Sequence, residues 1–442
     1  MRGYNRLSAV LYWLLLWSQR AVHFRRIRLP EVAVPLIGFV LRLRYGVCRI
    51  RSWLRLRRGK LRVLFVIGDK TKWKAGLLYK EMLKSGYVDP FVCPTVMDVG
   101  FYGEKELHTR FKECKEYFAN RGYRTKCLNK EDDLTPIPLS SLHPDILIYL
   151  QPWGLSNVHQ PIAASECALT YYLPYCTFSY GNRLEMYDLP FVRFVYCHMM
   201  DNDRWVAYYR KLSSPFRFGC IMKGVGSPYC EQILNRGDVK TSKKCIIYAP
   251  HWSFKHEKNK SMYYISTFDW SGIPMLEFAK AHPEINWIFK PHPGLRAKLE
   301  STGFMANEEI DRYYKTWEQL GESNYDSDYD ELFARSTAMV TDCSTFLVEY
   351  LVTGKPLIRL TSKSSAKPMP PNEMLLDAFY VANDVNSMLR QLEKIAINGS
   401  DTMWGLRQRV RHIMGLDDIH SVDAIMSCLL GRKERTLKRK AR

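Results

Sequence analysis

The sequence lacks the patterns that mark several common kinds of site. Its twelve cysteines include no Cys-x2-Cys pair, and their scatter argues against both a zinc site and a dense disulfide framework. It contains no Gly-x4-Gly-Lys-[Ser/Thr] loop, no Gly-x-Gly-x-x-Gly and no His-Glu-x-x-His. Thr177-Phe-Ser179-Tyr-Gly181 lacks the first glycine of a nucleophile elbow. We expect a reducing compartment and chemistry that needs neither a metal nor a cofactor.

The body of the chain has no excess of charge of either sign. The formal net charge is +20, yet residues 1–62 carry fifteen Lys and Arg against Glu31, and residues 432–442 carry seven against Glu434. Residues 63–431 balance at 43 basic and 43 acidic side chains. Such a body gives no reason to expect a nucleic-acid channel, and we predict no nucleic-acid partner.

The N-terminal segment has no apolar run long enough to cross a bilayer, which takes roughly 20 residues. Its apolar runs, residues 10–17 and 32–41, are interleaved with arginines and tryptophans. Tryptophan suits the headgroup boundary, and each Lys or Arg adds ~1 kcal/mol of attraction to anionic lipid. A signal peptide would end at a small-residue cleavage site, which is missing. Residues 1–60 are predicted to be a basic amphipathic segment that binds the cytoplasmic face of the cell membrane peripherally. A nucleic-acid arm or a solvated, partner-binding segment is the alternative.

From residue 61 short apolar runs alternate with longer mixed ones, the pattern of parallel sheets covered by helices. The first Rossmann-like domain is predicted over residues 61–236, with strands at 61–68, 91–96, 124–128, 145–150, 171–176 and 191–200. After a polar linker, a second such domain covers residues 243–400, with strands at 245–249, 285–289, 338–341 and 356–360. Helices and a basic tail fill residues 401–442. Removal of residues 1–58 should leave a folded body.

Three polar motifs follow predicted strands of the second domain. They are Pro250-His251-Trp252-Ser253, Lys290-Pro-His292-Pro293 and Asp342-Cys-Ser344-Thr345. Ligands of open α/β sheets bind outside the carboxyl ends of the strands, so these side chains should converge on one edge.

Ser344 and Thr345 open a predicted helix, whose unpaired N–H groups and positive dipole end attract phosphate. Alternatively, Ser344 or Asp342 only caps that helix. His292 stands between two prolines that fix its direction, which suits a group that meets a diphosphate or transfers a proton. It could equally be a loop histidine bonded to backbone, and His251 with Trp252 could serve packing alone. Asp201-Asn-Asp203 could share a divalent ion but also resembles a helix start.

The three motifs resemble those of the CDP-glycerol glycerophosphotransferase family, the teichoic-acid and capsule-type polyol-phosphate transferases. Tyr248-Ala-Pro-His-Trp252 is similar to the family's Tyr-Ala-Pro-x-Trp, and Lys290-Pro-His-Pro293 to its histidine-proline segment. Thr341-Asp-Cys-Ser-Thr345, with Glu349 and Gly354-Lys-Pro356, is similar to its serine-rich segment and the next helix. Gly224-Val-Gly-Ser-Pro228 resembles its interdomain link.

The resemblance implies a GT-B-like α/β fold, two Rossmann-like domains facing a cleft, and a peripheral membrane enzyme. It would move glycerol phosphate, or a related polyol phosphate, from a CDP-activated donor to a hydroxyl of a polymer or lipid-linked acceptor in the synthesis of a teichoic acid or capsule. His292, Ser344 and Thr345 would contact the donor's diphosphate. We assign His251 and His292 as catalytic and Lys290, Asp342, Ser344 and Thr345 as donor-binding.

The sequence departs from the family at one point. The acceptor-side His-Gly that follows a strand of the first domain is missing from residues 173–181, and Tyr175 stands where the histidine is expected. The alternatives are a glycosyltransferase of the same fold, which attacks carbon instead of phosphorus, and a non-catalytic scaffold on the membrane surface.

Overall fold

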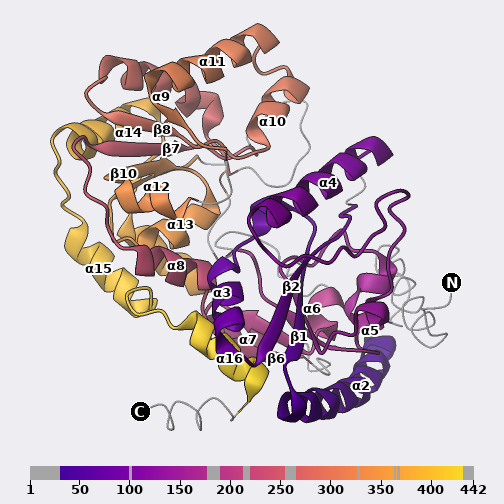
Figure 1. Ribbon diagram of the computed structural model, residues 1–442. Helices are drawn as coiled ribbons and strands as arrows, with labels where there is room; N and C mark the ends of the chain where they lie inside the picture. Colours follow the sequence, from indigo (N-terminus) through magenta and orange to yellow (C-terminus); the bar gives the residue numbers. More distant parts are fainter. Residues whose placement is uncertain are drawn as a thin grey trace. The chain divides into compact units, whose positions relative to one another are not determined.

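The computed structural model describes residues 30–98, 102–176, 190–212, 220–253, 265–325, 329–362, 365 and 369–431. These residues divide into two compact units (Figure 1). Unit 1 comprises the described residues up to Cys176, those from 190 to Pro228 and those from His420 onward. Unit 2 comprises those from Tyr229 to Ile419.

Unit 1 is built on six parallel strands in the order β2-β1-β3-β4-β5-β6. They are β1 (Leu61–Ile67), β2 (Val88–Pro94), β3 (Ile146–Tyr149), β4 (Leu169–Tyr172), β5 (Cys197–Met200) and β6 (Ile221–Gly224). The helices are α2 (Pro30–Arg58), α3 (Gly76–Ser85), α4 (Glu104–Asn120), α5 (Pro161–Ala164), α6 (Pro190–Phe194), α7 (Asp203–Leu212) and α16 (Ser421–Leu430). Near-continuous apolar strands such as Leu61–Ile67 are buried on both faces, as a covered parallel sheet requires.

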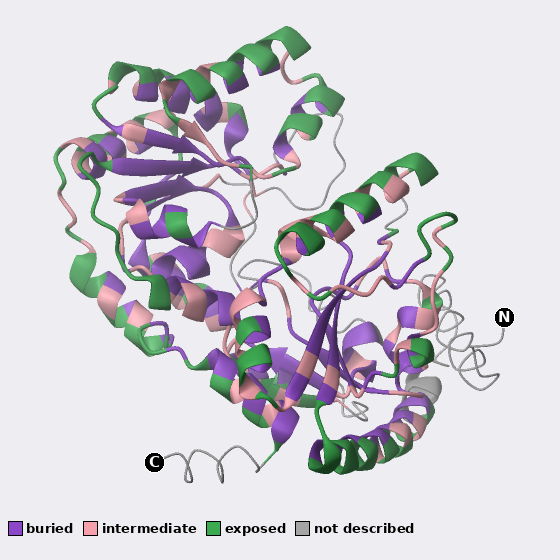
Figure 2. Ribbon diagram, viewed as in Figure 1, coloured by how far each residue is buried: buried purple, intermediate pink, exposed green. Residues whose placement is uncertain are grey.

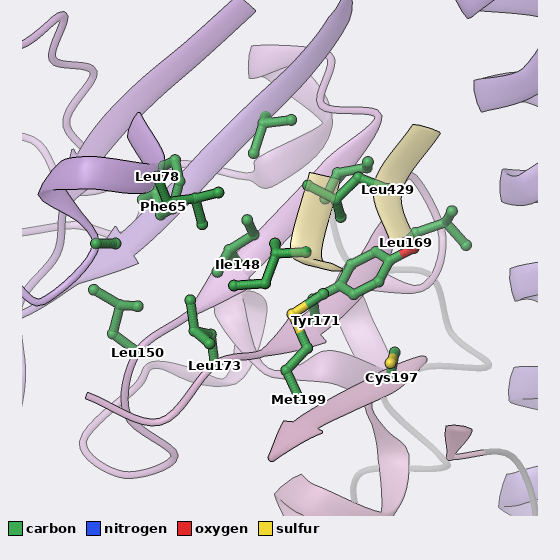
Figure 3. Close-up of a cluster of buried hydrophobic side chains, with 14 of the residues drawn as sticks. Phe65, Leu78, Ile148, Leu150, Leu169, Tyr171, Leu173, Cys197, Met199 and Leu429 are labelled. Carbon is green, nitrogen blue, oxygen red and sulfur yellow. The ribbon is translucent and has the colours of Figure 1, made fainter. Parts of the chain in front are cut away.

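Alternate residues of neighbouring strands form the core on one face of the unit 1 sheet. Figure 3 shows Ile148 and Leu150 beside Tyr171, Leu173 and Met199, a spacing of two that puts these side chains on the same face. Helix α16 adds Leu429 to this core, although it lies more than 200 residues further along the chain. The C-terminal end of the described chain is therefore part of unit 1.

Helix α2 also belongs to unit 1. Ile37, Leu41, Tyr45 and Cys48 are at most 3% exposed and lie in the same core as β1 and β4. The Tyr45 hydroxyl lies 2.6 Å from the Thr170 hydroxyl and donates to the Phe194 carbonyl at 2.7 Å. For the residues of α2, these contacts contradict the prediction of a separate segment over residues 1–60, of which residues 1–29 lie outside the described residues. From the sequence, the apolar residues of this segment are explained by membrane binding alone, whereas those on one side of the helix pack in the core of unit 1.

Unit 2 repeats the architecture with six parallel strands in the order β12-β11-β10-β7-β8-β9. They are β7 (Cys245–Ala249), β8 (Asn286–Phe289), β9 (Glu322–Ser323), β10 (Ala338–Thr341), β11 (Leu357–Leu360) and β12 (Tyr380–Ala382). The helices are α8 (Pro228–Arg236), α9 (Phe268–Ala281), α10 (Leu295–Thr302), α11 (Asn307–Leu320), α12 (Asp330–Arg335), α13 (Ser344–Leu351), α14 (Val385–Leu392) and α15 (Trp404–Ile413). In both units the central strands are buried and the outward faces of the helices are exposed (Figure 2).

The two parallel sheets confirm the predicted α/β fold of two Rossmann-like domains. Two predicted strands need correction. Residues 124–128 run beside β2 with a single bridge from Thr125 to Val92, and the apolar run 191–200 holds α6 before β5. An apolar run does not distinguish a short buried helix from a strand. The structure also assigns α8, within the predicted first domain, to unit 2, and divides residues 401–431 between the units. None of the described helices has the length and apolarity needed to cross a bilayer.

Removal of residues 1–58 should unfold unit 1. Each large apolar side chain of α2 that is buried contributes about 1.5–3 kcal/mol, and several of them together approach the whole stability of a domain, about 5–15 kcal/mol. The truncated protein should lose its cooperative thermal transition in circular dichroism. Val47→Gln, on the exposed side of α2, is the control and should melt like the full chain. An unchanged transition in the truncated protein would contradict the assignment of α2 to the core.

Candidate functional site

The candidate site of unit 2 lies where its sheet reverses strand order. Across this parallel sheet β7 is followed by β8 and β9 toward one edge, and β10 is followed by β11 and β12 toward the other edge. The adjacent strands β7 and β10 therefore flank the switch point. In open α/β sheets this point, at the carboxyl ends of the strands, is where ligands bind. Two of the three predicted motifs follow these two strands, and the third follows β8, the neighbour of β7. The structure brings all three together.

His251 and His292 are neighbours at this edge. Their ring centroids are 4.9 Å apart, and the His292 N–H donates to the Pro250 carbonyl at 2.9 Å, which ties the two strand-end segments together. The Trp252 ring lies 5.7 Å from His251 and 6.1 Å from His292. Burial lowers the pKa of His251 well below its usual range, and His292 lowers it further. His251 is therefore neutral at physiological pH.

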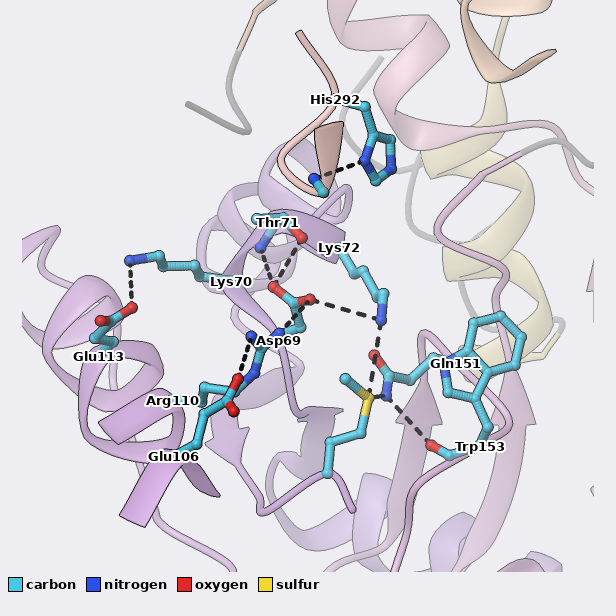
Figure 4. A network of polar contacts seen from close by, with 12 residues as sticks. Asp69, Lys70, Thr71, Lys72, Glu106, Arg110, Glu113, Gln151, Trp153 and His292 are labelled. Atoms are coloured by element: carbon cyan, nitrogen blue, oxygen red, sulfur yellow. Dashed lines mark hydrogen bonds and ion pairs between the residues drawn. The ribbon is translucent and has the colours of Figure 1, made fainter. Parts of the chain in front are cut away.

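The hydrogen bonds of both rings fix which nitrogen carries the proton. The Gly294 backbone N–H donates to His292 Nδ1 at 3.0 Å (Figure 4), and the Ser253 backbone N–H donates to His251 Nδ1 at 3.2 Å. A backbone N–H can only donate, so each Nδ1 accepts and the proton of the neutral ring is at Nε2. Each imidazole thus presents Nε2 as a donor, which suits a phosphate oxygen and does not suit proton abstraction.

Asp342 links the segments that carry the site through hydrogen bonds to its buried carboxylate. Its carboxylate is 3% exposed and accepts hydrogen bonds from His251 N–H at 2.6 Å, from Thr267 N–H at 2.6 Å and from the Thr267 hydroxyl at 3.1 Å. Burial raises the pKa of Asp342 to about 6, although these bonds oppose the rise. Both oxygens are occupied by the protein. Asp342, predicted to bind the donor, is a positioning residue that joins the ends of β7 and β10 to the start of α9.

Helix α13 begins at Ser344, as predicted, and neither Ser344 nor Asp342 caps it. The N-cap residue is Cys343, whose side chain makes no capping hydrogen bond. Burial raises the pKa of the Cys343 thiol to about 12, so the thiol stays neutral. The half-buried hydroxyls of Ser344 and Thr345 make no hydrogen bond within the described residues. The positive end of this helix is available to an anion.

Lys290 lies in a buried polar cluster behind the site. Its side chain is among the buried charged ones, donates to Asn324 Oδ1 at 3.0 Å and lies 4.7 Å from the centre of the Tyr329 ring. Tyr329 in turn donates to Glu349 at 2.5 Å. Sequence reasoning singled out Lys290 and Glu349 but missed Asn324 and Tyr329, because these two lie outside the strand-end motifs.

Unit 1 carries a polar network at its own switch point, which sequence reasoning missed. It follows β1 and β3, the strands at which the order of this sheet reverses. Asp69 lies 3.6 Å from the Lys72 ammonium and 3.7 Å from the Arg110 guanidinium (Figure 4). The Lys72 ammonium also lies 5.6 Å from the ring of Trp153 and 5.7 Å from that of Tyr175. Burial lowers the pKa of Lys72, while Asp69 opposes the shift. The strand-end rule, applied to residues 68–74, would have found this cluster.

The ring of Tyr175 therefore lies near the Lys72 ammonium, and Tyr175 occupies the position where the resemblance predicts a histidine. Burial raises the pKa of Tyr175 well above its usual range, so the phenol is not ionised. Of the predicted segment 173–181, residues 177–181 lie outside the described residues. The Asp201-Asn-Asp203 pattern is a helix start, since the Asn202 side chain accepts from Trp205 N–H at 3.1 Å and caps α7. Within the described residues no three His, Cys, Asp or Glu side chains cluster as metal ligands.

Fold and site together define a protein of two Rossmann-like domains, the second of which gathers two imidazole donors and an open helix N-terminus at its switch point. Residues 223–364 match the family model of CDP-Glycerol:Poly(glycerophosphate) glycerophosphotransferase. All three strand-end motifs lie within this segment. The match confirms the predicted resemblance there and the enzyme class that it implies, a CDP-glycerol glycerophosphotransferase-like transferase. No curated protein sequence matches the chain.

Solved structures agree on the fold. The wall teichoic acid polymerase TagF, in a variant soaked with CDPG, is 12% identical, with 98% of this chain and 99% of that chain covered and a TM-score of 0.50. A UDP-N-acetylglucosamine 2-epimerase is also 12% identical, with 87% and 97% covered and a TM-score of 0.50. At this identity the likeness is one of fold, and it confirms the predicted GT-B class.

Asp342→Asn should weaken the hydrogen bonds that hold the site together, although the side chain keeps nearly the same size and shape. An amide turns a donor toward His251 N–H or Thr267 N–H, and each buried donor left without a partner costs about 1–3 kcal/mol. We expect a lower melting temperature and weaker nucleotide binding, measured by differential scanning calorimetry and isothermal titration with CDP-glycerol. Asp311→Asn, which removes an exposed ion pair with Arg296, is the control and should change neither. Wild-type behaviour of Asp342→Asn would show that the carboxylate does not brace the three segments.

Proposed function

We propose that this protein is a membrane-associated transferase that moves glycerol phosphate from CDP-glycerol to a hydroxyl of a polymer or lipid-linked acceptor in the synthesis of a teichoic acid or a similar surface polymer. The observation that carries the proposal is the pairing of His251 and His292 as Nε2 donors beside the open start of α13. The match of residues 223–364 supports CDP-glycerol as the donor.

In this reaction the acceptor oxygen attacks the phosphorus that carries the glycerol. The bond from that phosphorus to the bridging oxygen breaks, CMP leaves, and the proton of the acceptor hydroxyl passes to solvent. Phosphoryl transfer of this kind depends mainly on positioning and on stabilising the charge of the phosphate oxygens. The N–H groups of the two imidazoles would hold the diphosphate, and the dipole of α13 with the Ser344 and Thr345 hydroxyls would stabilise the leaving phosphate.

The acceptor groups would come from the carboxyl edge of the unit 1 sheet. Lys72 offers a cation between two aromatic rings, Trp153 and Tyr175, on which a sugar or polyol can pack. The basic N-terminal segment would keep the enzyme on the cytoplasmic face of the cell membrane, near a lipid-linked acceptor.

A donor panel tests the function. The full chain would be incubated with CDP-glycerol, CDP-ribitol and several sugar nucleotides, and release of the nucleotide would be followed for each. Selective release of CMP from CDP-glycerol supports the proposal. Turnover of a sugar nucleotide instead would make the protein a glycosyltransferase, and membrane recruitment with turnover of no donor would make it a scaffold.

His292→Ala should lower the rate by ~10²–10³, the usual loss when one preorganised donor is removed from a charge-stabilising site. His292→Gln should restore much of this rate, because the amide keeps an N–H and loses only the ability to titrate. Rates of CMP release and donor affinities would be measured for both. A glutamine variant that binds donor normally but is as inactive as alanine, together with a wild-type rate that follows one ionisation near about 6.5, would make His292 the general base.

Replacement of Ser344 and Thr345 together by alanine should weaken CDP-glycerol binding at least ~10-fold and barely change the melting temperature. Neither hydroxyl caps α13, and a hydrogen bond to a charged group contributes about 1.5–3 kcal/mol. The control is Asp384→Ala, which removes the cap that Asp384 provides to Ser387 N–H at the start of α14. It should lower stability and leave donor binding unchanged. If the double variant loses stability but binds donor normally, as the control does, Ser344 and Thr345 only stabilise the start of the helix.

A further inference from the structure

Helix α2 carries a second apolar face that no described residue of unit 1 covers. Seven of the sixteen exposed large apolar side chains of the described residues lie on it, each between 41% and 60% exposed: Leu36, Phe39, Leu43, Val47, Ile50, Trp53 and Leu54. From Leu36 to Trp53 the steps are three or four residues, and Leu54 follows Ile50 by four, which keeps the side chains on one side of the helix at about 100° per residue. The side chains that α2 buries in the core lie on the opposite side. We call this exposed series the outer stripe.

Arginines border the outer stripe on both sides. At the same angular step, Arg42 and Arg49 fall on one border and Arg51, Arg55 and Arg58 on the other. A second copy of the chain would bring two such cationic borders together, whereas an anionic bilayer surface matches both the apolar stripe and its borders.

The end of α2 forms one wall of a pocket. Five basic side chains line it: Arg51, Arg55, Arg58, Lys60 and Arg62. The two carboxylates of the pocket already have partners. Asp145 accepts from Arg62 N–H at 2.8 Å and lies 3.9 Å from Arg55, and Asp89 pairs with Arg124 and lies 3.8 Å from Arg62.

Of the remaining cations, Arg51 donates to the Glu166 carbonyl at 3.2 Å, while the side chains of Arg58 and Lys60 have no ion-pair or hydrogen-bond partner within the described residues. The Arg58 and Lys60 side chains are both exposed. The pocket thus keeps three positive charges beyond its two acids. Guanidinium and ammonium groups gathered in this way recognise phosphate oxygens, the guanidinium with two parallel hydrogen bonds.

The pocket also touches the outer stripe, because Leu54 belongs to both. It opens at the amino ends of β1, β2 and β3, where Arg62, Asp89 and Asp145 lie, and so at the edge of the sheet opposite to Asp69 and Lys72. We propose that this pocket binds the phosphate of an anionic phospholipid headgroup, with the acyl chains beside the outer stripe. The proposal rests on the membrane association proposed above and names the lipid class and its site.

The test compares two double variants that remove the same charge from the same end of the chain. Arg58→Gln with Lys60→Gln alters the pocket, and Arg49→Gln with Arg57→Gln lies outside it. Sedimentation of the full chain with phosphatidylcholine vesicles, with and without phosphatidylglycerol, gives the affinities. Both pairs lose the general attraction of two charges. The pocket pair should bind phosphatidylglycerol vesicles about 10-fold more weakly than the control pair, because it also loses directed hydrogen bonds to phosphate.

Three results would overturn the proposal. Equal losses in the two pairs would mean that only general attraction acts. Weaker binding of soluble glycerol 3-phosphate by the pocket pair, with vesicle binding equal to that of the control pair, would assign the pocket to a free phosphate ester. Conversion of a dimer to a monomer by Leu43→Gln with Ile50→Gln, without a change in vesicle binding, would make the outer stripe a self-interface.

Turnover of CDP-glycerol in detergent-free solution with a soluble acceptor separates this proposal from the proposed function. The pocket variants should turn over donor like the unaltered chain, since neither Arg58 nor Lys60 is among the groups assigned to the reaction. Lost vesicle binding with normal turnover supports a lipid site on an active enzyme. No turnover in any form of the protein would overturn the proposed function and leave the vesicle comparison intact as the test of the pocket.

Discussion

The arrangement of the candidate site depends on one buried carboxylate. Asp342 accepts hydrogen bonds from the backbone of His251 and from Thr267, so one side chain fixes the segments that follow β7 and precede α9 relative to the end of β10. Burial of a carboxylate is costly unless donors surround it, and here they do. The link then determines where both imidazoles lie, because His292 is bonded to the Pro250 carbonyl beside His251. The proposed phosphate recognition in unit 2 therefore rests on a group that need not touch the ligand.

Unit 1 shows how one helix can serve two environments. The core side of α2 contributes Tyr45 and Ile37 to the sheet packing, while Leu43 and Ile50 on the other side remain exposed. A helix that is apolar on two sides gives little net amphipathicity along its length, and for that reason its pattern in sequence does not reveal which side is core. Five of its arginines lie between the two sides and are exposed: Arg42, Arg49, Arg51, Arg55 and Arg58.

The sequence predicted the strands and the positions of the polar motifs that follow them far better than the boundaries between units. Strands 245–249 and 338–341 were found at their observed limits because both are short, fully buried apolar runs that end in polar motifs. The role of Asp342 was not predictable, since its partners Thr267 and His251 are 75 and 91 residues away. The cluster of Asp69 and Lys72 was within reach of the same strand-end rule. Residues 191–200 were misread because apolarity alone does not select a strand.

By itself the sequence determined the α/β class, the three motifs at the carboxyl ends of unit 2 strands, and the concentration of positive charge at the two ends of the chain. These are local properties, because the residues that determine a buried strand or a helix start are neighbours in the sequence. The tertiary structure alone decided which nitrogen of each histidine carries the proton, that α13 has no side-chain cap, and that α2 and α16 complete unit 1. Each of these depends on contacts between residues far apart in sequence, and such contacts exist only once the sheets have formed.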